Sequence, residues 1–339
     1  MNHEYSPLFS PFEMPISIFQ VQCRMQRPLV LPDRSGADLR TSLRGAFGKA
    51  LMSLGCKNAA KGQSCFGLNT RHACQMPDHC ALPWLFEPHV AIQRRDHPSP
   101  VVLTLTGIDD QPGDTDEPAV SAMEIRLVLF GRHANQEREL VLAALSSAGQ
   151  RGLLEPGPTQ GSPARKPSSV SFEVQTNELW SGTLCDWVAG RFDGQVSSQL
   201  DIHLATPLCT DPPDFGPMLG NLAHDLVQWD LADSGLAAEF VAQGHGDAKR
   251  WCDDFADCAR AHVKKRLTKV RVNGDVSKMS LGRRRSRSNG NSFELHGFTG
   301  WLTLTGEFQP ILPWLVALEL RGGGKKKSFG LGEVRLEAL

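Results

Sequence analysis

The first half of the chain alternates between the two periods of regular secondary structure. Alternation of apolar and polar residues with period two, typical of half-buried strands, occurs in residues 16–25, 101–108, 122–130 and 168–174. Apolar residues at helical spacing occur in residues 38–54 and 137–148, with Asp38 as an expected N-cap. The order strand, helix, strand, strand, helix, strand predicts a split βαβ unit.

The second half repeats this order with more helix. A strand is expected over 196–204, helical segments over 215–243 and 247–263, and further strands over 268–272 and 301–305. Residues 310–320 form an apolar run of helical length, and a last strand is expected over 333–336. The two adjacent helical segments exceed what one crossover of a split βαβ unit requires, so we expect a helical insertion over 215–263.

A glycine-rich basic loop separates the last helix from the last strand. Its residues are Gly322, Gly323, Gly324, Lys325, Lys326, Lys327, Ser328, Gly330 and Gly332, with Phe329 and Leu331 between glycines. Glycine permits positive φ and close approach of backbone amides to a polyanion, and the lysines add charge at the same place. The spacing is not that of a Walker loop, which disfavours ATP. A solvated hairpin loop is the alternative, but the two apolar residues favour a packed loop that binds phosphates.

Charge is segregated along the chain. The formal net charge of the 339 residues is −1, yet residues 249–339 hold 18 Lys and Arg against 9 Asp and Glu. Between Arg260 and Arg287 there are 11 basic residues, and Asp275 is the one acidic residue. This tract includes Lys264, Lys265, Arg266, Arg283, Arg284, Arg285 and Arg287. Such a distribution favours RNA as the partner, although a tract ending in RRRSRS is often disordered until RNA is bound.

The residues GFTG at 297–300, LTLTGEFQPILPWL at 302–315 and GKKKSFGLG at 324–332 resemble the C-terminal signature of the CRISPR repeat-RNA processing endoribonucleases, the Cas6 family of the RAMP superfamily. The resemblance implies an α+β fold with two ferredoxin-like (RRM-like) domains in tandem and a C-terminal glycine-rich loop that holds RNA. We place the domains at 1–185, with a Cys-rich loop over 56–80, and at 186–339, with the helical insertion, the basic tract 260–287 and the glycine-rich loop 322–332.

The first predicted helix also resembles the family, in the segment LRGAFGKAL at 43–51. Family members often carry a histidine acting as general acid or base where this chain has Lys49. An unperturbed lysine mainly supplies fixed positive charge. We therefore expect Arg24, Arg40, Arg44 and Lys49 to stabilise transition-state charge. The alternative is an amphipathic helix with a solvated basic edge. The histidine-poor character also resembles type IV members of the family.

The resemblance implies a metal-independent endoribonuclease that binds the stem-loop of CRISPR repeat RNA, cleaves it by 2′-OH attack and stays bound to the guide RNA product. The one tyrosine, Tyr5, lies in a Pro-rich terminal segment and is not expected to be catalytic. Two alternatives remain: a non-cleaving repeat-binding subunit of an effector complex, and a zinc-stabilised nucleic-acid-binding protein unrelated to guide RNA. Other Cas effector subunits are expected partners.

Four cysteines, Cys56, Cys65, Cys74 and Cys80, lie within 25 residues, and could hold one structural zinc ion. The Cys-x2-Cys spacing of most structural zinc sites is absent, so reduced free thiols are the alternative. Catalysis needs no cofactor on this interpretation. With no run of about 18 apolar residues and no secretory signal pattern at the N-terminus, a cytoplasmic protein without membrane association is expected.

Overall fold

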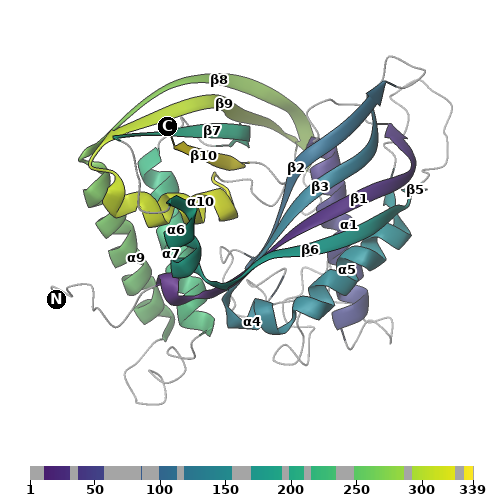
Figure 1. Ribbon diagram of the computed structural model, residues 1–339, viewed down its shortest axis with the longest axis horizontal. Coiled ribbons are helices and arrows are strands. Elements are labelled where there is room, and N and C mark those ends of the chain that lie inside the picture. Colours follow the sequence, from purple (N-terminus) through teal and green to yellow (C-terminus); the bar gives the residue numbers. More distant parts are fainter. Residues whose placement is uncertain are drawn as a thin grey trace.

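The computed structural model describes most of the predicted elements (Figure 1). The residues that it describes are 11–30, 37–56, 85, 99–112, 118–154, 169–192, 198–209, 215–233, 248–285, 292–324 and 332–338.

The N-terminal sheet has four antiparallel strands in the spatial order β2-β3-β1-β6. Its strands are β1 (Pro15–Val30), β2 (Val101–Pro112), β3 (Pro118–Phe130) and β6 (Phe172–Thr183). Helices α1 (Ala37–Gly55) and α5 (Arg138–Arg151) pack against each other beside this sheet (Figure 1). This strand order, with α1 and α5 as the two crossovers, is the ferredoxin-like arrangement predicted from the sequence.

Alternation along β1 explains why this sheet has one buried face. Val21 and Cys23 are buried under α1 and α5, whereas Gln22 and Arg24 are exposed on the other face. The stripe on α1 is buried as expected from Leu39 to Leu51. Leu54 was predicted to belong to that stripe and does not, since its side chain is 49% exposed in the last turn of the helix.

Several N-terminal elements differ from their predicted bounds. Strand β1 continues to Val30, past the predicted end at residue 25, and β6 continues to Thr183, past the predicted end at residue 174. The short elements η1 (Pro11–Glu13), α4 (Gly131–Gln136), β4 (Leu153–Leu154) and α6 (Leu184–Phe192) were not predicted, and the strand predicted over 168–174 is divided into β5 (Ser169–Val170) and the start of β6. Because pairing with neighbouring strands extends β1 and β6, their ends are set by tertiary contacts that a single-segment pattern does not contain.

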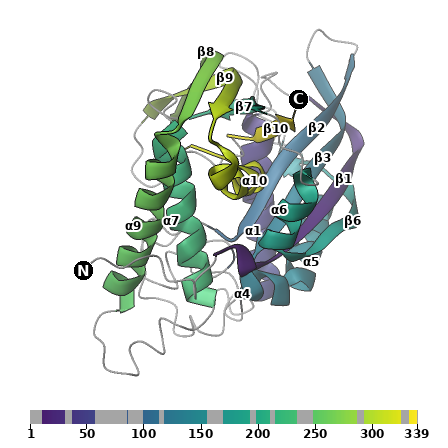
Figure 2. The same cartoon turned by 60° about the vertical axis from the view of Figure 1, so that its left-hand side comes forward.

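The C-terminal sheet repeats the same topology in the order β10-β7-β9-β8. Its strands are β7 (Gln199–Leu208), β8 (Val270–Arg285), β9 (Ser292–Gly306) and β10 (Val334–Ala338). The chain passes from β7 to β8 through α7 (Phe215–Asp233) and α9 (Ala248–Leu267), and from β9 to β10 through η4 (Gln309–Ile311) and α10 (Leu312–Arg321). Helices α7 and α9 pack side by side as the extra helical pair expected in this half (Figure 2). The predicted α+β class with two ferredoxin-like units is thus confirmed.

The two sheets share one hydrophobic cluster. Ile16, Ile18 and Phe130 of the first sheet pack in the same cluster as α7 and α10. Phe130 stacks on Trp229 of α7 with ring centroids 4.9 Å apart. The boundary predicted between residues 185 and 186 falls inside α6, whose Leu184 is buried in this cluster.

The basic tract differs most from its expected form. Residues 278–285 continue β8, and Arg283, Arg284 and Arg285 pair with Glu294, Phe293 and Ser292 of β9. Pairing with β9 from Val270 to Ser280 and again from Arg283 to Arg285 supplies order that the local composition does not predict. Among the helices of the described residues, none is long and apolar enough to cross a membrane.

Candidate nucleic-acid interface

Cations gather where α9 ends and β8 begins. Lys264, Lys265 and Arg266 occupy the last turn of α9, which continues past the predicted end at residue 263, and their side chains are exposed. Cations at a helix C-terminus interact favourably with the helix dipole, so this turn tolerates three in a row. Burial, and after it the neighbouring charges of Arg266 and Lys265, lower the pKa of His262. This turn therefore offers fixed charge for a phosphate backbone.

Strand β8 extends this positive charge along the edge of the sheet. Arg271 and Lys278 are exposed, whereas Lys269 is paired with Glu307 across a distance of 2.6 Å from Nζ to Oε2. The described backbone of β8 ends at Arg285, and the predicted contact Arg287 lies outside the described residues. Because β8 is the outermost strand, its unpaired edge and its cations lie along one border of the molecule.

The two ends of the glycine-rich loop meet at its base. Gly322, Gly324 and Gly332 have φ of 77°, 77° and 84°, the positive values for which glycine is suited. The amide of Gly323 donates a hydrogen bond of 2.8 Å to the carbonyl of Gly332. A Cβ at position 332 would overlap the Gly323 carbonyl oxygen. These glycines close the loop by direct contact between backbones, while Lys325, Lys326, Lys327, Ser328 and Gly330 lie outside the described residues.

A network of charged groups centred on the buried Glu319 and Glu333 holds the base of the loop in place. The Glu319 carboxylate of α10 accepts hydrogen bonds from Arg191 of α6, at 3.3 and 3.4 Å, and from the Leu336 amide of β10, at 3.0 Å. Glu333, which directly follows the last loop glycine, pairs with Arg335 at 3.0 Å. Hydrogen bonds and ion pairs made by charged groups therefore join helix α6, helix α10 and strand β10.

The same network reaches the N-terminal sheet. Arg126 of β3 donates to the Glu319 carbonyl at 2.7 Å, and Arg335 donates to the Thr106 carbonyl of β2 at 3.1 Å. Burial lowers the pKa of Arg126, and Glu319 and Glu333 oppose that shift. Sequence reasoning did not identify this network. One signal was visible, since Glu319 is a lone carboxylate inside the apolar run at 310–320.

The predicted catalytic cations lie on two sides of the N-terminal sheet, three of them on α1 and one on the sheet face opposite α1. Arg40 and Arg44 are half-buried on α1, and Lys49 is exposed on the same helix. The Lys49 carbonyl accepts a 3.5 Å hydrogen bond from Arg151, which adds a further cation at the end of α5. Arg24 lies on the face of the sheet opposite α1. The structure thus brings Arg40, Arg44 and Lys49 onto one element and does not place Arg24 beside them.

The predicted zinc site falls mainly outside the described residues. Cys65, Cys74 and Cys80 are not described, and Cys56 is a buried free thiol at the end of α1. Within the described ranges, no group of three or more His, Cys, Asp and Glu side chains is arranged to hold a metal ion. The zinc site stays a prediction.

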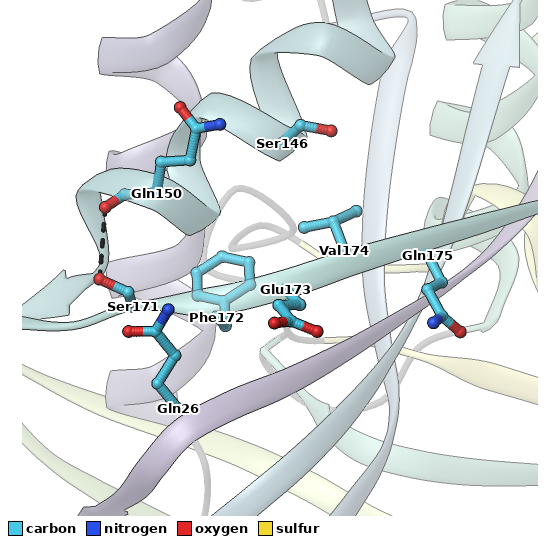
Figure 3. Close-up of a pocket in the computed structure, with 8 residues that line it drawn as sticks. All are labelled: Gln26, Ser146, Gln150, Ser171, Phe172, Glu173, Val174 and Gln175. Atoms are coloured by element: carbon cyan, nitrogen blue, oxygen red, sulfur yellow. Dashed lines mark hydrogen bonds between the residues drawn. The ribbon is translucent and has the colours of Figure 1, made fainter.

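A polar hollow of about 540 Å³ lies between α5 and the edge strand β6 (Figure 3). Its lining residues are Gln26, Ser146, Gln150, Ser171, Phe172, Glu173, Val174 and Gln175. The Ser171 hydroxyl donates to the Gln150 carbonyl at 3.3 Å and links the strand to the helix. No cation lines this hollow, which separates it chemically from the basic surface of α9 and β8.

Comparison with known families agrees with the sequence resemblance. Residues 202–334 match the model of the CRISPR-associated endoribonuclease Cas6 family, and residues 14–178 match a model described as an N-terminal domain. The first match spans β7 to β10 and includes the glycine-rich loop. This match agrees with the resemblance seen in the C-terminal signature.

Solved structures similar to this chain include several Cas6 proteins. A Cas6 (TTHA0078) product complex has 17% identity and a TM-score of 0.45, and the match covers 96% of this chain and 100% of that one. Thermus thermophilus Cas6 (TTHB231) has 12% identity and a TM-score of 0.45, covering 96% and 99%. A protein from a Cas6-related gene of Pyrococcus furiosus has 9% identity and a TM-score of 0.43, covering 95% and 98%. Among curated proteins, none matches this sequence significantly.

Proposed function

We propose, from the Cas6 family match over residues 202–334, that this chain binds the stem-loop of CRISPR repeat RNA and cleaves the precursor to give guide RNA. That match is the observation that carries the proposal. The exposed cations of α9 and β8, and a glycine-rich loop closed at its base, support it because an RNA backbone needs charge and accessible amides.

The proposed reaction uses the RNA's own 2′-oxygen as nucleophile. The 2′-oxygen attacks the adjacent phosphorus, the bond from phosphorus to the 5′-oxygen breaks, and the products are a 2′,3′-cyclic phosphate and a 5′-hydroxyl. The proton leaves the 2′-hydroxyl, and a proton is added to the departing 5′-oxygen. On this proposal Arg44 and Lys49 stabilise the negative charge of the phosphorane, with Arg40 as a further cation on α1.

Single-turnover cleavage rates test this assignment. Arg44→Ala and Lys49→Ala are each expected to lower the chemical rate by about 10²-fold or more while binding changes little, because the cation acts on charge that develops only in the transition state. A lysine acting as a permanent cation gives no inflection near pH 6.5 in the rate profile. Wild-type rates in both variants would remove α1 from the active site.

Binding to the phosphate backbone is tested by salt dependence. We expect the logarithm of affinity to fall with the logarithm of salt concentration by about 0.7 per phosphate contact. Lys264→Ala with Lys265→Ala, and separately the triple change Lys325, Lys326 and Lys327→Ala, are expected to lower affinity and flatten this slope. Arg138→Ala is the matched control, since it removes an exposed cation of α5. Affinity that is independent of salt contradicts the proposal.

A second candidate function is a repeat-binding subunit that does not cleave. The observation that favours it is Lys49, which occupies the position where the family often has a histidine. Denaturing electrophoresis of hairpin repeat RNA, after incubation with the protein and a chelator, separates the possibilities. Cleavage in chelator supports the metal-independent enzyme, uncut but bound RNA supports the subunit, and unbound RNA contradicts both. A metal-free protein that cleaves also shows that no cofactor takes part.

A further inference from the structure

An aromatic pair lies on the open face of the C-terminal sheet. Trp301 of β9 and His203 of β7 stack with ring centroids 4.3 Å apart and an interplanar angle of 12°. Trp301 is 42% exposed, although tryptophan is one of the most apolar side chains. Its neighbours Leu302 and Leu304 point the other way and are buried. The indole therefore lies on the face that the strand alternation directs away from the core.

The helices of the C-terminal unit cover the opposite face of this sheet. Leu200 and Ile202 of β7 and Leu304 of β9 belong to the hydrophobic cluster formed with α7 and α10. The stacked rings of Trp301 and His203 lie on neighbouring strands and are paired in register. Pairing across two strands holds both rings nearly parallel to each other. The pair is a fixed flat surface of the kind on which a further ring can stack.

The surroundings of the pair are polar. Asp275 of β8 lies in register with Trp301, and Arg335 of β10 lies in register with His203. In the next row, Asp201 accepts a hydrogen bond of 2.8 Å from the Thr303 hydroxyl. A protein partner bound through apolar contact needs a broad apolar patch, which this row of Asp and Arg interrupts. A ligand with a single flat ring and polar edges matches this surface better than such a protein partner does.

A nucleobase combines those two properties. It has a flat π face that stacks on indole, and amino or imino groups at its edge that donate to a carboxylate such as Asp275. Along β8, Arg271 lies four residues before Asp275, on the same face of the strand, and is exposed, so it can contact a phosphate that flanks a stacked base. The negative charge of the Asp275 carboxylate disfavours a phosphate directly above the two stacked rings.

We propose that Trp301, stacked on His203, binds the base of an unpaired RNA nucleotide that flanks the stem-loop, and that Asp275 accepts a hydrogen bond from the base edge. This inference rests on the proposed function, and it adds a second contact outside the cleaved hairpin. Sequence reasoning did not identify the pair, because Trp301 was interpreted as one position of a strand and His203 lies about 100 residues away.

The test compares two RNAs and three variants. One RNA is the repeat hairpin alone, and the other is the same hairpin with a single-stranded flank. In wild type the single-stranded flank is expected to raise affinity for the RNA. Trp301→Ala is expected to lower affinity for the flanked RNA by about 10-fold and to leave affinity for the bare hairpin unchanged. Trp301→Phe retains a ring and is expected to keep most of the gain. Leu179→Ala is the matched control, since Leu179 is another exposed apolar side chain, 51% exposed, on β6.

Each outcome separates this inference from the proposed function. Loss of the flank's contribution in Trp301→Ala, with the Phe variant retaining it, supports the inference. Equal affinity of wild type and Trp301→Ala for the flanked RNA overturns it while the proposed function stands. If neither RNA binds wild type, both fail. Self-association of wild type that Trp301→Ala abolishes, measured by sedimentation without RNA, also overturns it, because a second copy would then occupy the face.

Discussion

Replacing Gly332 by alanine is expected to destabilise the fold at the base of the glycine-rich loop. Gly332 has a φ of 84°, and a Cβ there would overlap the carbonyl oxygen of Gly323. Positive φ costs a residue with a Cβ about 1–2 kcal/mol. Relief of the overlap requires the two backbones to separate, which breaks the 2.8 Å hydrogen bond from the Gly323 amide at a further cost of about 1 kcal/mol.

The expected loss of unfolding free energy is therefore about 2–3 kcal/mol. The reduced entropy of the unfolded chain offsets less than about 1 kcal/mol of it. Strain at Gly332 affects the whole C-terminal unit because β10 begins two residues later and Val334 and Leu336 are buried in the shared core. The same separation of backbones is expected to weaken RNA binding at temperatures where the variant is folded.

Urea denaturation of both proteins measures the effect. Gly190→Ala is the control, since Gly190 lies in α6 and an added Cβ meets nothing within 4 Å. That variant is expected to be as stable as wild type or up to about 1 kcal/mol more stable, because alanine favours helix. A Gly332→Ala protein that unfolds at the same urea concentration as wild type would refute the argument from backbone contact.

Three further predictions concern the ion pair of Glu319, the thiol of Cys23 and the cysteines of residues 56–80. Glu319→Gln is expected to lower unfolding free energy by about 1–2 kcal/mol, because it removes the charge opposite Arg191, whose side chain is 36% exposed, whereas Glu178→Gln, which weakens the exposed pair with Arg138, should cost about 0.5 kcal/mol or less in the same thermal melts. Burial raises the pKa of Cys23 from 9.0 to about 12, so the folded chain keeps a proton that the unfolded chain loses, and stability should fall as pH rises from about 9 to 12. The unfolding free energy of Cys23→Ala, measured by denaturation across that pH range, should fall less steeply with pH than that of wild type. An equal fall in both proteins would assign the effect to other groups. Elemental analysis of protein purified without chelator should find about one zinc per chain if Cys56, Cys65, Cys74 and Cys80 bind it, and none if the thiols are free.

The order of elements could be predicted from the sequence because it depends on local periodicity. Two rounds of strand, helix, strand, strand, helix, strand were visible in the alternation of apolar residues, and both sheets have that topology. The ends of strands were less predictable. Strand β8 continues to Arg285 because β9 pairs with it, and the arginine-rich composition there favours no strand by itself.

The candidate site divides in the same way. Sequence alone determined which residues offer positive charge or an unhindered backbone, since the charge of Lys264, Lys265 and Arg266 and the conformational freedom of the loop glycines are properties of the residue types. Tertiary structure decided which of them meet: it brought Gly323 to Gly332, Glu319 to Arg191, and Trp301 to His203 from segments about 10, 130 and 100 residues apart. It also placed Arg24 on the sheet face opposite α1. Contacts of this kind depend on strand order and register, which the packing of the whole chain fixes and no local pattern contains.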